Sequence, residues 1–344
     1  MTQTTRTLAL FALIALAPVP LIAGGAVLGG GAVWAALGYM TLLAAASDRL
    51  VRRITPALAP DQGAQLADLV SVILALGHFV LLALAVLAVS GATGLPLPQR
   101  LALFFAAGLY FGQVSNSNAH ELIHRHNPWL RGLGVAVYTS LLFGHHASAH
   151  PKVHHRFVAT PKDPNSAREG VGFYRFAPRA WLGSFVAGFK AERQSQRARL
   201  HPYVYYVTGA LLTVAVAGQL AGPAAIASLL LLAGYAQTQL LLSDYVQHYG
   251  LTRKLLDNGR PEAVSPKHSW NAHHWFTSLL MLNAPRHSDH HAHPARPYPS
   301  LRLPAVGEAP RLPHSLPVMA VIALFPPLWR RVMRRELAKW RALG

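Results

Sequence analysis

The chain contains 19 histidines in 344 residues, and nine of them fall into four clusters. The first cluster is His120-Glu121-Leu122-Ile123-His124. An α-helix rises about 1.5 Å per residue, so residues four apart lie one above the other on the same face. If this segment is helical, the imidazoles of His120 and His124 can bind one metal ion together.

A second cluster contains His150, His154 and His155. On an α-helix, His150 and His154 share a face, whereas His155 is rotated toward a neighbouring site. We therefore expect this cluster to supply ligands to two metal ions at once.

The third cluster, His287-Ser288-Asp289-His290-His291, repeats this arrangement with offsets of three and four residues. The fourth cluster is a single histidine, His248, which follows directly after a long apolar segment. We expect His248 to lie at the same depth in the molecule as His120.

Nine imidazoles are more than one ion of about four to six ligands can use, so the pattern predicts two metal ions. The chain has no cysteine, which excludes disulfides, thiolate zinc sites and iron–sulfur clusters held by this chain. Imidazole binds iron, zinc and copper alike, so ligand type alone does not choose the metal.

The elements that position these histidines are predicted to lie in a membrane. Apolar residues make up 52% of the chain and charged residues only 13%, against about 25% charged in a soluble domain. Six segments approach the about 20 apolar residues that cross a bilayer. They are residues 7–23, 26–46, 69–89, 101–118, 203–220 and 223–243.

We therefore predict one all-α domain over residues 1–344, a polytopic membrane helical bundle of about six transmembrane helices with a cytoplasmic histidine-rich helical cap. The transmembrane hairpins are predicted at about 7–46, 69–118 and 203–243, and the cytoplasmic catalytic segments at about 119–202 and 244–344.

Most basic residues fall in these two cytoplasmic segments, whereas the connection between the third and fourth spans contains only Arg100. The positive-inside rule then predicts a multi-pass protein of a bacterial-type inner membrane with both termini cytoplasmic. The net charge of +18 predicts contact with anionic lipid. Nucleic acid is not an expected partner, because no soluble basic fold or stacking platform is visible.

At these residues the chain resembles the integral-membrane alkane hydroxylases (alkane 1-monooxygenases), within the wider membrane fatty-acid desaturase and hydroxylase group. The resemblance is most specific in the first cluster, in Ala159–Arg168, in Arg286–Ala292 and in Phe325–Trp329. Plain desaturases have three histidine boxes, and the His248-Tyr249-Gly250 element separates this branch from them.

The resemblance implies a non-haem centre of two iron ions, O₂ as co-substrate, and electrons from a rubredoxin or ferredoxin and its reductase. Carried over residue by residue, it implies these metal ligands: His120, His124, His150, His154, His155, His248, His287, His290 and His291.

Several residues near the histidines differ from the usual pattern of the alkane hydroxylases, so by this resemblance the chain is a divergent member. In the second box, Ala149 and Val153 replace the usual Glu and Gly, and Pro285 replaces the usual Gln before the third. Around the fourth, Asp244 and Gln247 replace the usual Asn and Glu. Ala149 and Gln247 each remove a carboxylate that could hydrogen-bond a metal-bound imidazole.

Four carboxylates lie near the clusters: Glu121, Asp163, Asp244 and Asp289. We expect Glu121 and Asp289, with Asp244 as a third candidate, to accept hydrogen bonds from ligand imidazoles and orient them. The alternative for Glu121 and Asp289 is solvation on a helix surface or pairing with Arg125 and Arg286.

The predicted function is hydroxylation of the terminal methyl group of medium- to long-chain n-alkanes, taken from the bilayer, to 1-alkanols. One alternative is a fatty-acyl or other hydrocarbon desaturase or hydroxylase of the same group. A membrane zinc protease would match the first cluster, where Glu121 would act as general base, but leaves the other seven histidines unexplained. A metal transporter or store would place its ligands near the midplane of the spans instead.

Overall fold

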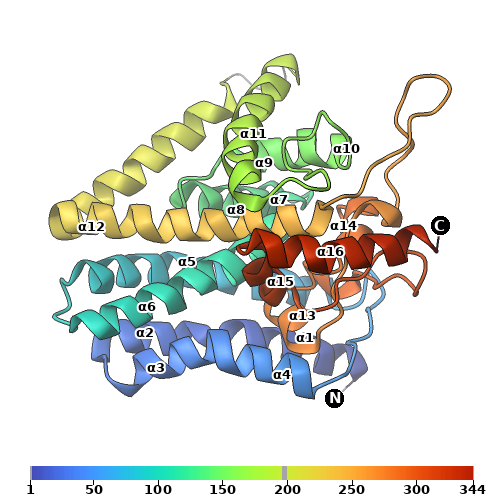
Figure 1. The fold of residues 1–344 in the computed structure, drawn as a ribbon. Helices are drawn as coiled ribbons and strands as arrows, with labels where there is room; N and C mark the ends of the chain where they lie inside the picture. The colour runs from blue at the N-terminus through green and yellow to red at the C-terminus, as the bar shows by residue number, and fades with distance from the viewer. Residues whose placement is uncertain (1, 196–199, 344) are drawn as a thin grey trace.

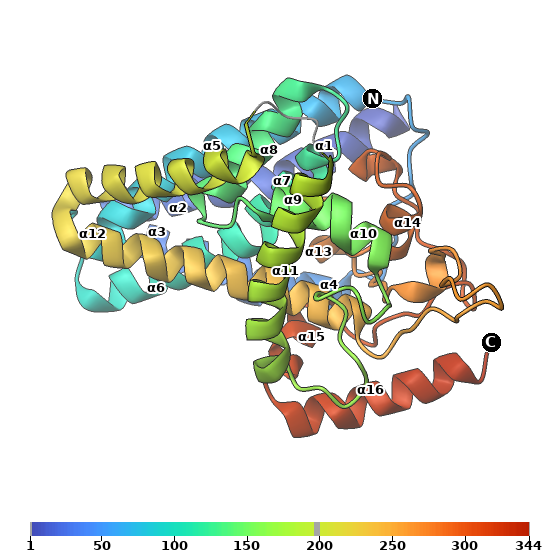
Figure 2. The same cartoon turned by 90° about the horizontal axis from the view of Figure 1, so that it is seen from above.

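The computed structural model describes residues 2–195 and 200–343, and these residues form helices joined by loops, with no β-strand among them. Figures 1 and 2 show a bundle of long helices, with the shorter helices gathered toward one end. Both termini lie at that same end. The predicted all-α membrane bundle with a histidine-rich helical region is confirmed.

The first rod runs through α1 (Gln3–Leu16) and α2 (Pro18–Leu28) without a break. Gly29 and Gly30 then turn the chain with φ of 66° and 61°, a conformation that favours glycine. The return rod comprises α3 (Gly31–Gly38), a π-helical turn η1 (Tyr39–Leu43) and α4 (Ala44–Leu50).

The second hairpin consists of α5 (Ala64–Ser90) and a rod made of three consecutive elements. These are α6 (Leu97–Tyr110), the π-helical turn η2 (Phe111–Ser115) and α7 (Asn116–Ile123). Because α7 continues the rod, the first histidine cluster is held at the end of a long helix rather than on a loop.

The third hairpin is α12 (Pro202–His248), which bends at Ala221 and Gly222 and continues through Pro223. Gly222 has a φ of 66°, and the two arms diverge from this bend (Figure 1). His248 is the last residue of the second arm.

Among the described residues, three helical segments are long and apolar enough to cross a membrane: Gln3–Leu28, Ala64–Ser90 and Pro202–His248. The segment predicted at 26–46 begins in α2 and the glycine turn and continues in the rod 31–50, whereas the segment predicted at 101–118 lies within the rod 97–123. Both rods are interrupted by a π-helical turn.

The remaining helices form the cap. They are α8 (Pro128–Ser140), α9 (His146–Ala149), the π-helical turn η3 (His150–His154), α10 (His155–Phe157), α11 (Phe173–Ser195), the 3₁₀ turn η4 (Pro266–His268), α13 (Trp275–Leu280), α14 (His287–Ala292), the 3₁₀ turn η5 (Tyr298–Ser300), α15 (Leu316–Ala323) and α16 (Pro326–Arg341). Helix α11 crosses the bundle direction, as Figure 1 shows.

Close packing at glycine joins the cap to the first histidine cluster. Gly134 of α8 faces α7, where an added Cβ would lie 2.8 Å from Leu122 Cβ and 2.9 Å from the Ala119 carbonyl oxygen. Gly132 of the same helix has no atom within 4 Å of an added Cβ. The contact at Gly134 therefore sets the distance between α8 and the helix that carries His120.

We predict that Gly134→Val lowers the midpoint of thermal unfolding in detergent, measured by circular dichroism, because overpacking costs about 1–3 kcal/mol. Gly132→Val is the matched control, since it makes the same change of helix propensity in open space. Equal midpoints for the two variants would contradict the proposed role of Gly134.

Candidate metal centre

The structure brings all nine histidines of the four clusters together in two groups. The first group contains His120, His124, His150, His155 and His290, and the second contains His154, His248, His287 and His291. Within each group, one nitrogen from every ring lies within 4.8 Å of the others. Residues up to 171 positions apart in the chain therefore converge, as the sequence predicted.

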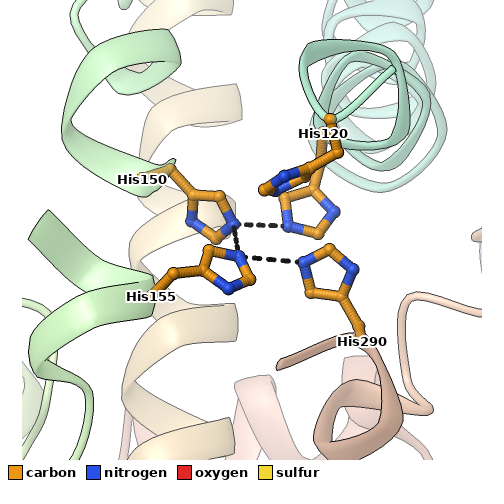
Figure 3. Close-up of side chains that lie close together, drawn as sticks. His120, His150, His155 and His290 are labelled. Carbon is orange, nitrogen blue, oxygen red and sulfur yellow. Dashed lines mark hydrogen bonds between the residues drawn. The ribbon is translucent and has the colours of Figure 1, made fainter. Parts of the chain in front are cut away.

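Four elements supply the first group, namely α7 with its C-terminal cap His124, η3, α10 and α14. The labelled rings turn nitrogen atoms toward one another (Figure 3). The Nε2 atoms of His120 and His150 lie 2.7 Å apart, and those of His150 and His155 lie 2.9 Å apart. His290 of α14 closes the group, with its Nε2 atom 3.1 Å from that of His155. The ring of His124 lies 4.7 Å, centroid to centroid, from the ring of His155.

The second group lies beside the first and is fully buried. The Nε2 atom of His287 lies 3.0 Å from that of His248 and 3.1 Å from that of His291. The ring of His154 completes the group, 4.7 Å from that of His248 and 4.9 Å from that of His291. The Nδ1 atom of His248 contacts the backbone oxygen of His268 at 3.3 Å, which fixes the ring orientation.

These groups fit two metal ions. Neighbouring nitrogens bound to one ion at about 2.1 Å lie about 3 Å apart, which is the spacing that the facing Nε2 atoms have. The Nε2 atoms of His124 and His154 are buried, and the described residues offer them no hydrogen-bond partner. A buried nitrogen without a partner is destabilising unless something binds it, and an ion at each centre would do so.

The prediction of which histidines of the second cluster bind the same metal ion was wrong in one respect. His150 and His155 belong to one group and His154 to the other, whereas α-helical spacing paired His150 with His154. The reason is the π-helical turn η3 at His150–His154, which widens the helix so that residues five apart share a face. Pro151 lacks the N–H that an α-helix would use at that point.

The other clusters follow ordinary helical spacing. His120 and His124 share the first group, as the sequence predicted. In α14, His287 and His291 are four residues apart and share the second group, whereas His290 turns to the first. Two clusters thus each contribute to both groups, which holds the two centres side by side.

Burial keeps the imidazoles of His290 and His291 neutral. Burial, together with the neighbouring imidazoles, lowers the pKa of His290 and of His291 well below the ordinary value for histidine. Neutral rings have a free nitrogen lone pair at neutral pH, so protons do not compete with a metal there.

Asp163 orients one of the ligands. Its Oδ2 atom lies 2.9 Å from Nδ1 of His154, and it accepts a 2.6 Å hydrogen bond from the Ser166 hydroxyl. Burial opposes ionisation of this carboxyl, but His154 and Ser166 hold the pKa of Asp163 below its usual value. An ionised Asp163 fixes the proton of His154 on Nδ1 and directs Nε2 into the second group.

The sequence pointed instead to Glu121 and Asp289, and this expectation was wrong. Glu121 accepts a 3.0 Å hydrogen bond from the Tyr298 backbone N–H and pairs with Arg125 at 3.0 Å. Asp289 pairs with Arg296 at 2.6 Å and accepts from the Arg302 backbone N–H. Neither carboxylate hydrogen-bonds a ring of the two groups, because arginine side chains and backbone N–H groups already engage both.

Asp289 also differs from the alternative expectation, since its partner is Arg296 rather than Arg286. Arg286 donates to the backbone carbonyl oxygens of Leu301 and Thr55 instead. Asp244, the third candidate, accepts a 2.6 Å hydrogen bond from the Asn165 amide and contacts no ligand ring by a hydrogen bond. Asp163 follows His154 by nine residues in the sequence. This spacing did not indicate that its carboxylate contacts the His154 ring.

Ala149 and Gln247, which replace the usual Glu residues of the family pattern, each have a structural role in this chain. Ala149 is buried where α11 crosses, and a Cβ added at Gly188 would lie 3.1 Å from the Ala149 Cβ. A longer side chain at Ala149 would therefore separate α11 from α9. Gln247 donates a 3.2 Å hydrogen bond to the Ala284 carbonyl oxygen and so anchors the loop that leads into α14.

A small cavity of about 50 Å³ opens directly beside the histidines. His120, His150 and His287 line it, so it reaches residues of both groups. At Gly112, Ser243 and Met281 it adjoins a larger chamber of about 280 Å³ that is lined mostly by apolar side chains. A hydrocarbon chain in the larger chamber could thus extend one end to the histidines.

A comparison of sequences assigns the family. The pattern of the fatty acid desaturase family matches residues 95–322, which is most of the chain, and the chain belongs to this family. Residues 95–322 include every one of the nine histidines.

Among known proteins, the chain is similar to several monooxygenases. It is 36% identical over 250 residues to alkane 1-monooxygenase 1 of Alcanivorax borkumensis and 35% identical over 251 residues to alkane 1-monooxygenase of Ectopseudomonas oleovorans. Each alignment covers 70% of this chain and 61% of the relative, so the chain matches about three fifths of their length. It is also 29% identical, over 64% of this chain and 60% of the relative, to the xylene/toluene monooxygenase hydroxylase component of Pseudomonas putida.

We predict that Asp163→Asn weakens metal binding about 10- to 100-fold, because the neutral amide no longer fixes the proton on His154. The affinity is measured by competition with a chelator on the purified protein. Asp61→Asn, which removes an exposed carboxylate outside both groups, is the control. An affinity unchanged by Asp163→Asn would contradict the role of this residue.

Proposed function

We propose that this chain is a non-haem di-iron monooxygenase of a bacterial-type inner membrane that hydroxylates the terminal methyl group of n-alkanes. The convergence of nine histidines into two adjacent groups is the observation that carries this proposal. The similarity to alkane 1-monooxygenases over 70% of the chain supports the same reaction.

We propose iron as the metal, with His120, His124, His150, His155 and His290 holding one ion, and His154, His248, His287 and His291 holding the other. Such a pair, when reduced, supplies the activation of O₂ that inserts one oxygen atom into a C–H bond and releases the other as water. An all-imidazole set suits a redox-active ion that must keep open positions for O₂.

The remaining task of the chain is to bind the substrate and keep water away. An n-alkane has no polar group, so burial must bind it, at about 0.8 kcal/mol per methylene. The apolar chamber offers such burial between Met40, Leu109, Leu242 and Leu316. Its contact with the small cavity beside the histidines favours attack at the end of the chain rather than along it.

We propose six membrane crossings, formed by the two arms of each of three hairpins, with both termini cytoplasmic. Three of the helices reach spanning length and hydropathy by themselves, and one of these, α12, contains two arms. The concentration of basic residues in segments 119–202 and 244–344 supports this orientation.

Two external electrons are needed for each oxygen molecule, and we propose a rubredoxin or ferredoxin with its reductase as their source. Such carriers are acidic, so the basic cytoplasmic face of a chain with net charge +18 would attract them. Anionic lipid would gather at the same face.

The metal content tests the two groups directly. We expect about two iron ions per chain by elemental analysis, and about one after His120→Ala/His124→Ala or after His287→Ala/His291→Ala, because each pair removes ligands from one group only. His293→Ala, which changes a half-exposed ring outside both groups, should keep both ions. One zinc ion per chain would instead support the protease alternative.

Product analysis tests the reaction. We expect cells that lack other alkane oxidation, but express this chain with a rubredoxin and its reductase, to convert octane or dodecane to the 1-alkanol with one ¹⁸O atom from ¹⁸O₂. His150→Ala should abolish the product, whereas His293→Ala should retain it. An alkene product would identify a desaturase, and no product from any hydrocarbon would contradict the proposal.

A further inference from the structure

One fully buried histidine lies in the bundle itself, apart from both groups of ligands. His78 is in α5, within the segment Ala64–Ser90 that is long and apolar enough to cross a membrane. An ionisable side chain at such a position is rare and is expected to pair with polar groups inside the bundle. The partners of its two ring nitrogens therefore show which elements it joins.

Both ring nitrogens of His78 have a partner, and the partners belong to different elements. The Nδ1 atom lies 3.0 Å from the hydroxyl oxygen of Ser115, the last residue of η2. The Nε2 atom lies 2.9 Å from the hydroxyl oxygen of Ser140, the last residue of α8. The ring also packs edge-on against Phe111, the first residue of η2, with 5.2 Å between the centroids. His78 thus joins α5 to both ends of the π-helical turn and to the end of α8.

The hydroxyl groups determine which nitrogen carries the proton. Ser140 donates its single hydroxyl hydrogen to the Val137 carbonyl oxygen at 2.8 Å, so Nε2 of His78 must donate to Ser140. In the neutral ring, Nδ1 is then an acceptor, and the Ser115 hydroxyl donates to it. A neutral ring of one tautomer therefore satisfies both contacts at once.

The contact with η2 controls the direction in which the first cluster points. The rod passes from α6 through η2 into α7, and His120 follows Ser115 by five residues. A π-helical turn holds about one more residue than an α-helical turn, and each residue turns an α-helix by about 100°. If η2 relaxed to an α-helical turn, His120 and His124 would rotate by about 100° around the rod and leave the first group.

The contact with Ser140 acts on the segment that leads to the second cluster. Helix α8 ends at Ser140, and Leu142 turns the chain with a φ of 58° before α9 begins at His146. The elements η3 and α10, which carry His150 and His155, follow directly. The first group takes four of its five ligands from α7 with its cap, η3 and α10, so both contacts of His78 converge on this group.

We propose that His78 is a positioning residue for the first group. It fixes the rotational orientation of α7 through η2 and the end of α8 through Ser140, and so holds four imidazoles in a geometry that binds a metal ion. The inference rests on the proposed assignment of the two groups as metal sites and is independent of the reaction. Its effect is selective, because the second group takes only His154 from the elements that His78 positions.

Metal binding by each group tests this selectivity without turnover. The full chain in detergent is titrated with Co²⁺ in competition with a chelator. One background, His287→Ala/His291→Ala, leaves the first group intact, and the other, His120→Ala/His124→Ala, leaves the second. We expect His78→Leu to weaken Co²⁺ binding by the first group about tenfold, at the lower end of the range for residues that orient ligands, and to leave binding by the second group unchanged.

Two milder variants separate the two contacts. Ser115→Ala and Ser140→Ala each remove one hydroxyl partner, and each should weaken binding by the first group in part. Adding either to His78→Leu should cause no further loss, because residues in one hydrogen-bond network are not additive. Leu81→Ala is the matched control, since it empties a buried apolar position about one turn along α5. It should lower the midpoint of thermal unfolding without weakening one group more than the other.

Two results would overturn the role of His78. One is the same change in Co²⁺ affinity for both groups of the His78→Leu chain, or no change in either, which would leave His78 a residue of general stability only. The other is wild-type affinity of the first group in both serine variants. Failure of the unmodified chain to bind Co²⁺ at all would instead overturn the assignment of the groups as metal sites, and this inference with it.

Discussion

Nine imidazoles must be kept packed together and pointed at one another, and every other feature of this molecule depends on that requirement. Rings at about 3 Å separation cannot satisfy all their nitrogens with each other, and each buried nitrogen left without a partner costs about 1–3 kcal/mol. His124 and His154 show this directly. Bound ions would supply the missing partners, so metal binding and stability of the cap should be coupled.

Rigid elements are needed to hold such a centre. Helix α7 delivers His120 from the end of a continuous rod, and α12 delivers His248 in the same way. The two remaining clusters lie on short helices that would not be stable alone, so they depend on packing against those rods. The contact of Gly134 with α7 and that of Ala149 with Gly188 show how closely the cap is fitted there.

Much of this arrangement could be predicted from the sequence, because long apolar runs and histidines at helical spacing are local patterns. The division of ligands between the groups could not, since the π-helical turn at His150–His154 departs from the spacing that the prediction assumed. Pro151 was the visible sign of an irregular helix. The orienting carboxylate was missed for a similar reason, because Asp163 reaches His154 through a loop whose path no periodicity describes.

The same geometry explains why a reactive centre can act on an inert chain. The histidines lie at one end of the bundle, and the apolar chamber begins beside them at Gly112 and Met281. A hydrocarbon held only by burial has no preferred position along the chamber, because each methylene contributes about equally. The position must therefore be set by where the chamber ends, and the small cavity of about 50 Å³ admits little more than the end of a chain. In the proposed reaction, selectivity for the terminal carbon would follow from the shape of the passage, without any polar contact with the substrate.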